Sequence, residues 1–529
     1  MANGNFAGGT GTIDDPYLIE DAHDFNRIYS GLSSHYKLVY DIDFSIVGFN
    51  RPDAGVFTGS LDGDGHTISN YSFGTLGVTG NAGLFRGING ATIKNMNIEN
   101  ARIASAASSA VLAGAAVGEN NTIQNVHIIN SRIESTSNGI AGFCGQAGGA
   151  VKLLDCSFQG EIVRNSGTSD SGYVGGLIGD LFGNVTIKKC KTNLTISTSN
   201  CSNCGGLVGR IRGLTQRIII ENCHSQFTII NSGSGSSYGG LIGYSDNVDI
   251  SESSAIGVIS APTSTGQMYG GLIGYLTNTN ASSCYSNVKI EAPNTFNSGG
   301  VFGSVYGGNI INNCYGHGSI IGNLRIGGLS GYTVGNSSLP STIKNSYSTV
   351  SVIVTTTTNQ KAAFASNVDF RYVTFSNNYC DIEATAGSGS LYAISGTTAY
   401  TGGIEGKTTL EMKTPSTFSA WDTDVWKFIE GQYPKLFFEP INTSFLYNKG
   451  NYKKWNNDHW QTISTTLPTE PIFKDEGMYS LSALDRKQTT ITIPMDDNTP
   501  QGQPLGNGRV FKEKINLKKY MEINSINVK

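Results

Sequence analysis

Charged side chains are scarce in this sequence. Lys, Arg, Asp and Glu make up 14% of its 529 residues, and the formal net charge is −4. This balance leaves no strongly basic surface, so the composition excludes a dedicated nucleic-acid partner. The sequence also lacks any run of about eighteen apolar residues, the length that a membrane-spanning helix requires. We therefore expect neither nucleic-acid binding nor membrane insertion.

The N-terminus lacks a recognisable export signal. Residues Met1 to Phe6 contain no charged stretch followed by an apolar one, which is the pattern of a secretory signal peptide. The sequence therefore predicts a protein that is made in the cytoplasm and is not exported by the ordinary secretion route.

Glycine, by contrast, is abundant, and much of it belongs to a repeat: the chain has 68 glycines. A tetrapeptide of the form Gly-Leu-Ile-Gly recurs about every thirty residues. Clear copies begin at Gly176, Gly206, Gly240, Gly271, Gly300 and Gly328, and weaker copies begin at Ala115, Gly142 and Ala363. A second marker follows each copy, as in Lys189-Cys190, Asn222-Cys223 and Asn313-Cys314.

The residues between the markers predict strands. β-Branched residues alternate with polar ones, as in Val185-Thr186-Ile187 and Val288-Lys289-Ile290. This alternation, interrupted by Gly, Ser and Asn, predicts two or three short strands per repeat. That number suits one coil of a solenoid but is too small for a propeller blade. We therefore predict an all-β fold, a parallel β-helix of about ten stacked coils that is expected to be right-handed.

Four segments are expected along the chain. Residues 1–75 form an N-terminal cap with a helix over residues 21–31, and residues 76–400 form the β-solenoid. Residues 401–443 form a closing cap, and residues 444–529 form a small β-rich or α+β module for attachment or oligomerisation. All four Trp lie in these last two segments.

The nine cysteines could indicate disulfides or a metal site. Five of them share one phase of the repeat, which Met96, Val126 and Ser254 also occupy. Equivalent positions stack in a solenoid, and parallel Cβ vectors one coil apart suit packing better than bridging. We predict a buried ladder of free thiols made of Cys156, Cys190, Cys223, Cys284 and Cys314.

Two short motifs resemble metal sites only in part. Cys201 and Cys204 have the spacing of half a zinc site, but no second pair matches them. Asp62 and Asp64 resemble the start of a calcium loop, but the later carboxylates of such a loop are missing. Both are predicted to be structural turns, so no metal ligand and no cofactor are expected.

Catalysis on a solenoid would require acids that face one another across a groove. Polysaccharide cleavage uses two such carboxylates. Acids are few in the repeats, and the densest group, Asp246, Asp249 and Glu252, is explained by solvated turns. We therefore predict no catalytic residue and no enzyme activity, with a polysaccharide-cleaving site as the alternative. The binding residues are left undefined.

The two repeat markers resemble the GLUG repeat of bacterial surface proteins and bacteriophage tail proteins. The segments Phe6 to Thr12 and Asp15 to Ile19 are similar to the start of such domains, and the likeness extends to about residue 438. The segments 448–463 and 481–497 are similar to pieces of tail-associated proteins from phages and prophages of Gram-positive bacteria. The resemblance implies a solenoid fold and brings no catalytic residue onto this chain.

This resemblance, the absent export signal and the additional C-terminal module favour a virion protein. We expect a tail fibre, tail spike or baseplate-associated protein in the virion tail that binds a host cell-surface polysaccharide or wall polymer. Its further partners would be other tail or baseplate proteins and copies of itself, with a homotrimer expected. The alternatives are an adhesin at the bacterial cell surface and a polysaccharide depolymerase.

Overall fold

The structure is a computed structural model. It describes residues 6–51, 55–77, 80–165, 172–213, 216–355, 360–385, 390–394, 402–439, 445–448, 451–456, 459–466, 496–497 and 511–512. The chain divides into two compact units, Met1–Phe438 and Glu439–Lys529, each of which is described by itself. No helix among the described residues combines the length and apolarity needed to cross a membrane.

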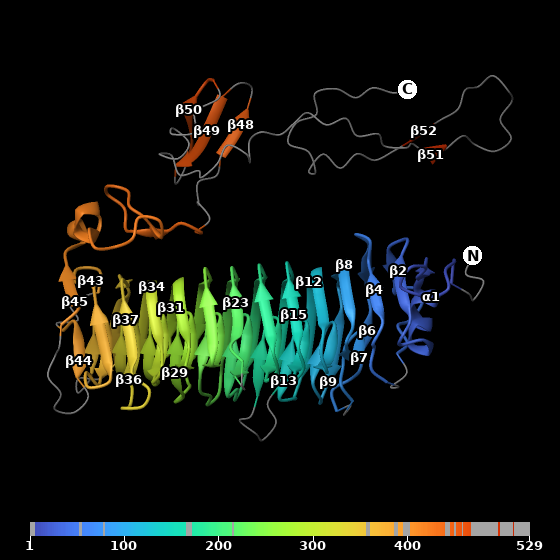
Figure 1. The fold of residues 1–529 in the computed structure, drawn as a ribbon, viewed down its shortest axis with the longest axis horizontal. Helices are drawn as coiled ribbons and strands as arrows, with labels where there is room; N and C mark the ends of the chain where they lie inside the picture. Colours follow the sequence, from blue (N-terminus) through green and yellow to red (C-terminus); the bar gives the residue numbers. More distant parts are fainter. Residues whose placement is uncertain are drawn as a thin grey trace. The chain divides into compact units, whose positions relative to one another are not determined.

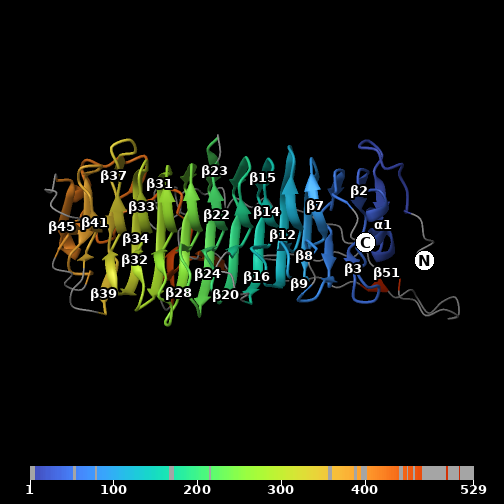
Figure 2. The ribbon, with the colours of Figure 1, turned by 90° about the horizontal axis from the view of Figure 1, so that it is seen from below.

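The first unit is a parallel β-solenoid whose coils follow one another from the blue to the orange end of Figure 1. One coil contains four short strands: β17 (Tyr173–Gly175), β18 (Ile178–Leu181), β19 (Val185–Lys188) and β20 (Lys191–Thr198). Each strand pairs in parallel with its equivalent in the next coil, and Figure 2 shows the same succession from a second side. This arrangement confirms the predicted fold.

The strands of successive coils form three sheets. Sheet A has 25 strands: β1 (Tyr17–Ile19), β2 (His35–Leu38), β3 (Ile42–Asp43), β4 (Ser60–Asp62), β5 (Thr67–Ser69), β6 (Ser72–Phe73), β8 (Thr92–Glu99), β9 (Arg102–Ser105), β12 (Asn121–Ser135), β15 (Val151–Leu154), β16 (Ser157–Arg164), β19, β20, β23 (Ile218–Glu221), β24 (His224–Asn231), β27 (Val248–Ser251), β28 (Ser254–Ser260), β31 (Asn280–Glu291), β34 (Ile310–Gly322), β37 (Ser341–Lys344), β38 (Tyr347–Ser348), β39 (Ser351–Val354), β42 (Val373–Ser376), β43 (Asn378–Asp381) and β45 (Ile404–Lys407).

Sheet B has 11 strands: β7 (Phe85–Asn89), β11 (Ala113–Val117), β14 (Cys144–Ala147), β18, β22 (Val208–Arg212), β26 (Ile242–Asp246), β30 (Ile273–Thr277), β33 (Phe302–Tyr306), β36 (Ser330–Val334), β41 (Ala365–Val368) and β44 (Tyr392–Ile394). Sheet C has nine: β10 (Ser109–Ala110), β13 (Gly139–Ala141), β17, β21 (Asn203–Gly205), β25 (Tyr238–Gly239), β29 (Gln267–Gly270), β32 (Phe296–Gly299), β35 (Leu324–Gly327) and β40 (Lys361–Ala362).

The Gly-Leu-Ile-Gly motif forms the turn from sheet C into sheet B. Its leucines, such as Leu177 and Leu207, are fully buried in the core. Its first glycine lies where neighbouring coils approach closely, because a Cβ on Gly176 would stand 2.3 Å from the carbonyl oxygen of Gly206. A side chain at this position would push the coils apart. The motif therefore recurs because each coil repeats the same contact with the next one.

A short helix stands at the N-terminal end of the solenoid (Figure 1). Helix α1 (Ala22–Arg27) continues into a 3₁₀ turn, Ile28–Ser30, within the predicted range of 21–31. The Asp21 carboxylate accepts hydrogen bonds from the backbone N–H groups of His23 and Asp24, which satisfies the first turn of the helix.

Residues 409–438, here called the flanking segment, do not form another coil. The segment contains α2 (Thr409–Met412), a 3₁₀ turn (Pro415–Phe418), β46 (Trp426–Lys427) and β47 (Lys435–Leu436). It packs on a row of stacked tyrosines on the outer side of sheet A and forms a small core of its own. This core comprises Tyr285, Tyr315, Tyr347, Tyr379, Met412, Phe418, Trp421, Trp426 and Leu436.

The flanking segment extends along several coils. Its Trp421 contacts Tyr379 near the C-terminal end of the solenoid, and its Phe438 stacks on His224, with ring centroids 5.9 Å apart. Residues 409–438, part of the closing cap expected at 401–443, thus lie against the side of sheet A.

The second unit contains an antiparallel three-stranded sheet. Its strands are β48 (Phe445–Asn448), β49 (Asn451–Asn456) and β50 (His459–Ser464). A further pair consists of β51 (Asp496–Asp497) and β52 (Phe511–Lys512). Most of the predicted module of residues 444–529 lies outside the described residues.

Candidate binding trench

The five cysteines of the predicted ladder are free and buried, and they share one position of the coil. Cys284 and Cys314 are direct partners in sheet A. Each thiol lies near the carbonyl oxygen two residues before it. The Sγ–O distances are 3.2 Å for Cys156, 3.3 Å for Cys190, 3.3 Å for Cys223, 3.2 Å for Cys284 and 3.4 Å for Cys314.

Serine takes the same place in other coils. Ser253 and Ser346 donate through Oγ to the carbonyl oxygens of Ser251 and Lys344, at 2.7 and 2.8 Å. Ser253 rather than Ser254 therefore belongs to this column. The sequence prediction was shifted by one residue because Glu252 takes the turn position that Asn usually takes.

The turn position before the column has a left-handed backbone. Its residues include Asn222 with φ 53° and Asn313 with φ 55°, and also Lys189 with φ 55° and Glu252 with φ 48°. Asn tolerates this conformation better than other residues with a side chain. The left-handed turn directs the next side chain into the core, which explains the Asn-Cys pair in the sequence.

Cys201 and Cys204 are also free and buried, and the Cys201 thiol lies 3.1 Å from the carbonyl oxygen of Gly172. No group of three or more His, Cys, Asp or Glu side chains in the described part of the chain could hold a metal ion.

Asp180 and the densest group of acids are engaged in ion pairs, hydrogen bonds or turns. Asp180 is buried and pairs with Arg210 at 2.7 Å, and Asp249 pairs with Arg217 at 2.6 Å. Asp246 accepts a hydrogen bond from Asn278, and Glu252 holds a left-handed turn. The structure therefore assigns a structural contact to each acid of the densest group.

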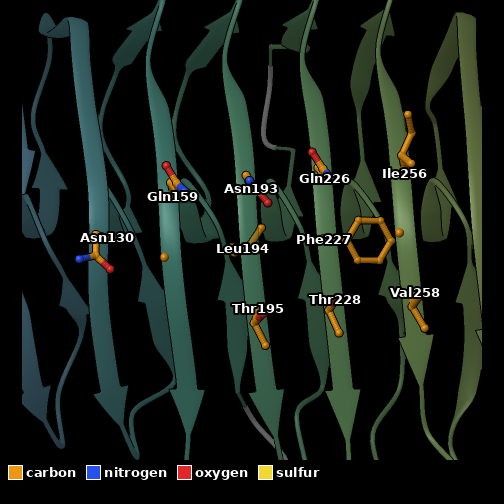
Figure 3. Close-up of a pocket in the computed structure, with 12 residues that line it drawn as sticks. Asn130, Gln159, Asn193, Leu194, Thr195, Gln226, Phe227, Thr228, Ile256 and Val258 are labelled. Atoms are coloured by element: carbon orange, nitrogen blue, oxygen red, sulfur yellow. The ribbon is translucent and has the colours of Figure 1, made fainter. Parts of the chain in front are cut away.

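An open trench lies on the outer face of sheet A, across β16, β20, β24 and β28 (Figure 3). Its volume is about 450 Å³, within the range of roughly 300–1,000 Å³ that is typical of ligand sites. The four strands lie side by side, so the trench runs along the solenoid axis for about 14 Å. It is lined by Asn130, Gln159, Gly160, Asn193, Leu194, Thr195, Gln226, Phe227, Thr228, Ile256, Gly257 and Val258.

Two rows of side chains border the trench. Figure 3 shows Gln159, Asn193 and Gln226 in one row, and sheet pairing places these residues directly beside one another. The opposite row consists of Thr195, Thr228 and Val258. The trench therefore presents amides on one side, and hydroxyl and methyl groups on the other.

The floor of the trench is formed partly by glycine backbone. A Cβ on Gly160 would stand 2.1 Å from the Ser131 carbonyl oxygen, and one on Gly257 would stand 2.0 Å from the Phe227 carbonyl oxygen. Beside Gly160, the pairing of β12 with β16 shifts register between Ile128 and Ser131. At this irregularity Gly160 occupies a position where a regular alternating strand would place a side chain, and the missing side chain leaves the hollow.

The amide row differs from the asparagine ladders elsewhere in the solenoid. In those ladders Asn100 donates to Asn70 at 3.1 Å and Asn130 donates to Asn100 at 2.6 Å, so the amides satisfy one another. The side-chain amides of Gln159, Asn193 and Gln226 are exposed and make no hydrogen bond to another residue that the structure describes. They are therefore available to a ligand.

Sequence reasoning missed this row, although a signal was present. Gln159, Asn193 and Gln226 each stand three residues after a cysteine of the column, and Gly160 follows the first of them. A repeated amide beside a glycine that interrupts an alternating strand indicates an outward polar row over exposed backbone.

The fold and the trench define a class of protein: a parallel β-solenoid with an open, uncharged groove along its axis. No family model matches the chain. An immunoglobulin A1 protease of Streptococcus sanguinis is 31% identical over 204 residues, which cover 37% of this chain and 10% of that protein. The zinc metalloprotease ZmpC of Streptococcus pneumoniae is 30% identical over 219 residues, which cover 40% of this chain and 11% of that protein.

Among solved structures, the chain is similar to a Bacteroides ovatus protein assigned as an immunoglobulin A1 protease. The identity is 17%, the TM-score is 0.34, and the match covers 82% of this chain and 96% of that one. The chain spans about a tenth of the length of the curated protease relatives named above.

These comparisons correct one expectation. They contradict the prediction of no enzyme activity, because the relatives are named as immunoglobulin A1 proteases and a zinc metalloprotease. Carboxylate pairs on the repeats bear on polysaccharide cleavage and not on proteolysis. The relatives named here are bacterial proteases and not phage tail proteins.

Proposed function

We propose that the chain is the solenoid of a bacterial cell-surface protein and that its trench binds an extended polymer. The observation that carries this proposal is the row of three exposed amides, which have no hydrogen-bond partner in the described part of the chain. Exposed donors and acceptors spaced by one coil can follow a polymer along the axis, whereas an isolated pocket would take a small molecule.

The protease relatives support the location. Immunoglobulin A1, after which they are named, is found outside cells, so a protein of that kind acts on the bacterial surface or beyond it. This location replaces the virion tail as the leading one and agrees with the alternative that the sequence left open.

The first prediction tests the trench directly. Replacing Gln159, Asn193 and Gln226 together by Ala should weaken binding to immobilised cell-surface polymers by at least about tenfold, because each lost hydrogen bond costs roughly 0.5–1.5 kcal/mol. Binding of the whole chain to a panel of bacterial wall polymers and host-cell glycans would be measured by biolayer interferometry.

The matched control is a pair of outward amides away from the trench, Gln124→Ala and Gln146→Ala. These changes should leave binding unaltered, and circular dichroism should show that both variants keep the β-solenoid. Equal binding by wild type and the trench variant would refute the proposal.

Proteolysis is the second candidate activity, and the names of the relatives support it. In that case the trench would hold a substrate for a protease. The whole chain would be incubated with immunoglobulin A1, with and without added zinc. Cleavage that a chelator abolishes would support this candidate, and intact antibody would exclude it for this chain.

A phage receptor-binding protein is a further candidate, which the distinct unit at residues 439–529 favours. Antibodies against the chain would label purified phage particles from the source strain if this candidate is correct. Label on the cell envelope in the absence of particles would favour the cell-surface protein.

A further inference from the structure

The trench carries no charge. All twelve lining residues are uncharged. Glu161 stands beside Thr195 at the edge of the trench, but its carboxylate is already paired with Arg132. Lys191 on β20 has the opposite sign and lies two residues before Asn193. An anionic or cationic polymer would lose part of its hydration in the trench without gaining an opposite charge. The lining therefore favours an uncharged ligand.

The spacing of the amides excludes a regular match with an extended peptide. Neighbouring strands lie about 4.8 Å apart, whereas an extended peptide advances about 3.4 Å per residue. A peptide would therefore fall out of step with the row formed by Gln159, Asn193 and Gln226. A pyranose ring linked through equatorial bonds advances by close to one coil spacing, so three successive sugars can each reach one amide of the row.

The backbone of the trench gives a second argument against a peptide. Strand addition requires an unpaired sheet edge. Strands β20 and β24 are paired on both sides, so their ladder hydrogen bonds are already made. Only side chains and short stretches of glycine backbone are available to a ligand.

The chemistry of the two rows suits a sugar chain. Amides and hydroxyls both donate and accept hydrogen bonds, as do the hydroxyls of a sugar. Gln226 lies on one side of the trench and Thr228 on the other, and the methyl groups of Val258 and Ile256 provide an apolar end. Sugar rings present both hydroxyl edges and apolar C–H faces.

We propose that the trench binds a linear, uncharged polysaccharide with equatorial linkages, with one sugar unit at each of the three amides and a fourth beside Ile256. The inference rests on the proposed function and adds the class of polymer and the register. The trench crosses four strands and is bounded at one end by Asn130 of β12, so we expect four sugars to fill it and a fifth to extend beyond Gly257 or Asn130.

The experiment is a length series with the whole chain. β-1,4-linked glucose oligomers and β-1,4-linked N-acetylglucosamine oligomers of two to six units would be titrated by isothermal calorimetry. For at least one series we expect affinity to rise about threefold to tenfold per added sugar up to four units and less than about twofold thereafter. An alternating glucuronic acid oligomer and a Ser/Thr peptide should bind at least about tenfold more weakly.

Two variants test the chemistry of the site. Asn193→Leu removes the central amide of the row and should reduce affinity for the neutral tetramer by about threefold to tenfold, while Gln124→Leu outside the trench should not. Tight binding of the acidic oligomer or the peptide, an absence of length dependence, or no binding of either neutral series would overturn the inference.

The outcomes separate this inference from the proposed function. If the triple amide variant loses binding to the polymer panel but neutral oligomers do not bind the wild type, only the choice of polymer fails. If the triple variant binds the panel as well as the wild type, the trench itself is not the site.

Discussion

At the scale of single residues, the solenoid depends on one left-handed turn per coil. Asn222 and Asn313 form this turn with a residue type that tolerates positive φ. Lys189 and Glu252 form the same turn with residue types that tolerate positive φ less well. The cost of a left-handed conformation for an ordinary residue is about 1–2 kcal/mol. Because the turn directs the next side chain into the core, the other coils retain it even at this cost.

A reciprocal pair of substitutions tests this cost. Lys189→Asn should raise the free energy of unfolding by about 1 kcal/mol, and Asn222→Lys at the equivalent position of the next coil should lower it by about the same amount. Urea denaturation monitored by circular dichroism would measure both. A shift of the same sign in the two variants would contradict the account.

At the scale of the element, the flanking segment is attached by aromatic side chains. Tyr285, Tyr315 and Tyr347 stack with centroids 5.1 and 4.7 Å apart and parallel planes. Trp426 donates through Nε1 to Asn313 Oδ1 at 3.1 Å, and Tyr347 donates to the Pro434 carbonyl oxygen at 2.7 Å. Burial of these large rings stabilises the segment, and the hydrogen bonds fix its position.

A histidine lies within this attachment. His317 lies among Tyr315, Tyr347 and Tyr433. Its Nδ1 atom forms a hydrogen bond with the Thr349 hydroxyl. Burial, with a further contribution from Lys435, lowers the pKa of His317 to about 4. The neutral form thus favours the folded state above the unfolded pKa of about 6.5.

The stabilisation should therefore decline as the pH falls from about 6.5 to about 4, because protonation of His317 is easier when the segment is displaced. Urea midpoints across this range should fall in the wild type. His317→Gln should show a smaller fall, with His224 accounting for part of the remainder, since burial also lowers its pKa to about 4. An equal fall in both proteins would contradict the assignment.

At the scale of the whole molecule, stability depends on contacts between neighbouring coils. Leu177, Leu207 and Leu241 are fully buried at equivalent positions of three successive coils. Each coil buries its core only with its neighbours, as in other repeat proteins.

Leu207→Ala should therefore cost about 2–5 kcal/mol and increase hydrogen exchange in β18 and β26 as well as in β22. The strands β48, β49 and β50 of the second unit should keep their exchange rates, because they belong to a separate compact unit. Hydrogen–deuterium exchange with mass spectrometry would measure both. An effect confined to β22 would show that the coils are independent.

Much of the fold could be predicted because the same local requirements recur in each coil. Close approach of neighbouring backbones demands glycine at Gly176 and Gly206, and the left-handed turn favours Asn at Asn222. Where an atypical residue such as Glu252 takes the left-handed turn, aligning the repeats by sequence alone places the column one residue too late. The position of the flanking segment could not be predicted, because an aromatic residue such as Trp426 can pack on any apolar surface.

The sequence by itself determined the solenoid and the shared phase of the five cysteines, because both depend on spacing along the chain. Only the tertiary structure decided which outward residues border a groove. Gln159, Asn193 and Gln226 are about thirty residues apart in sequence and become one row through parallel pairing of β16, β20 and β24. The groove beside them exists because a register shift and two glycines remove side chains from its floor, which is a property of neighbouring coils together.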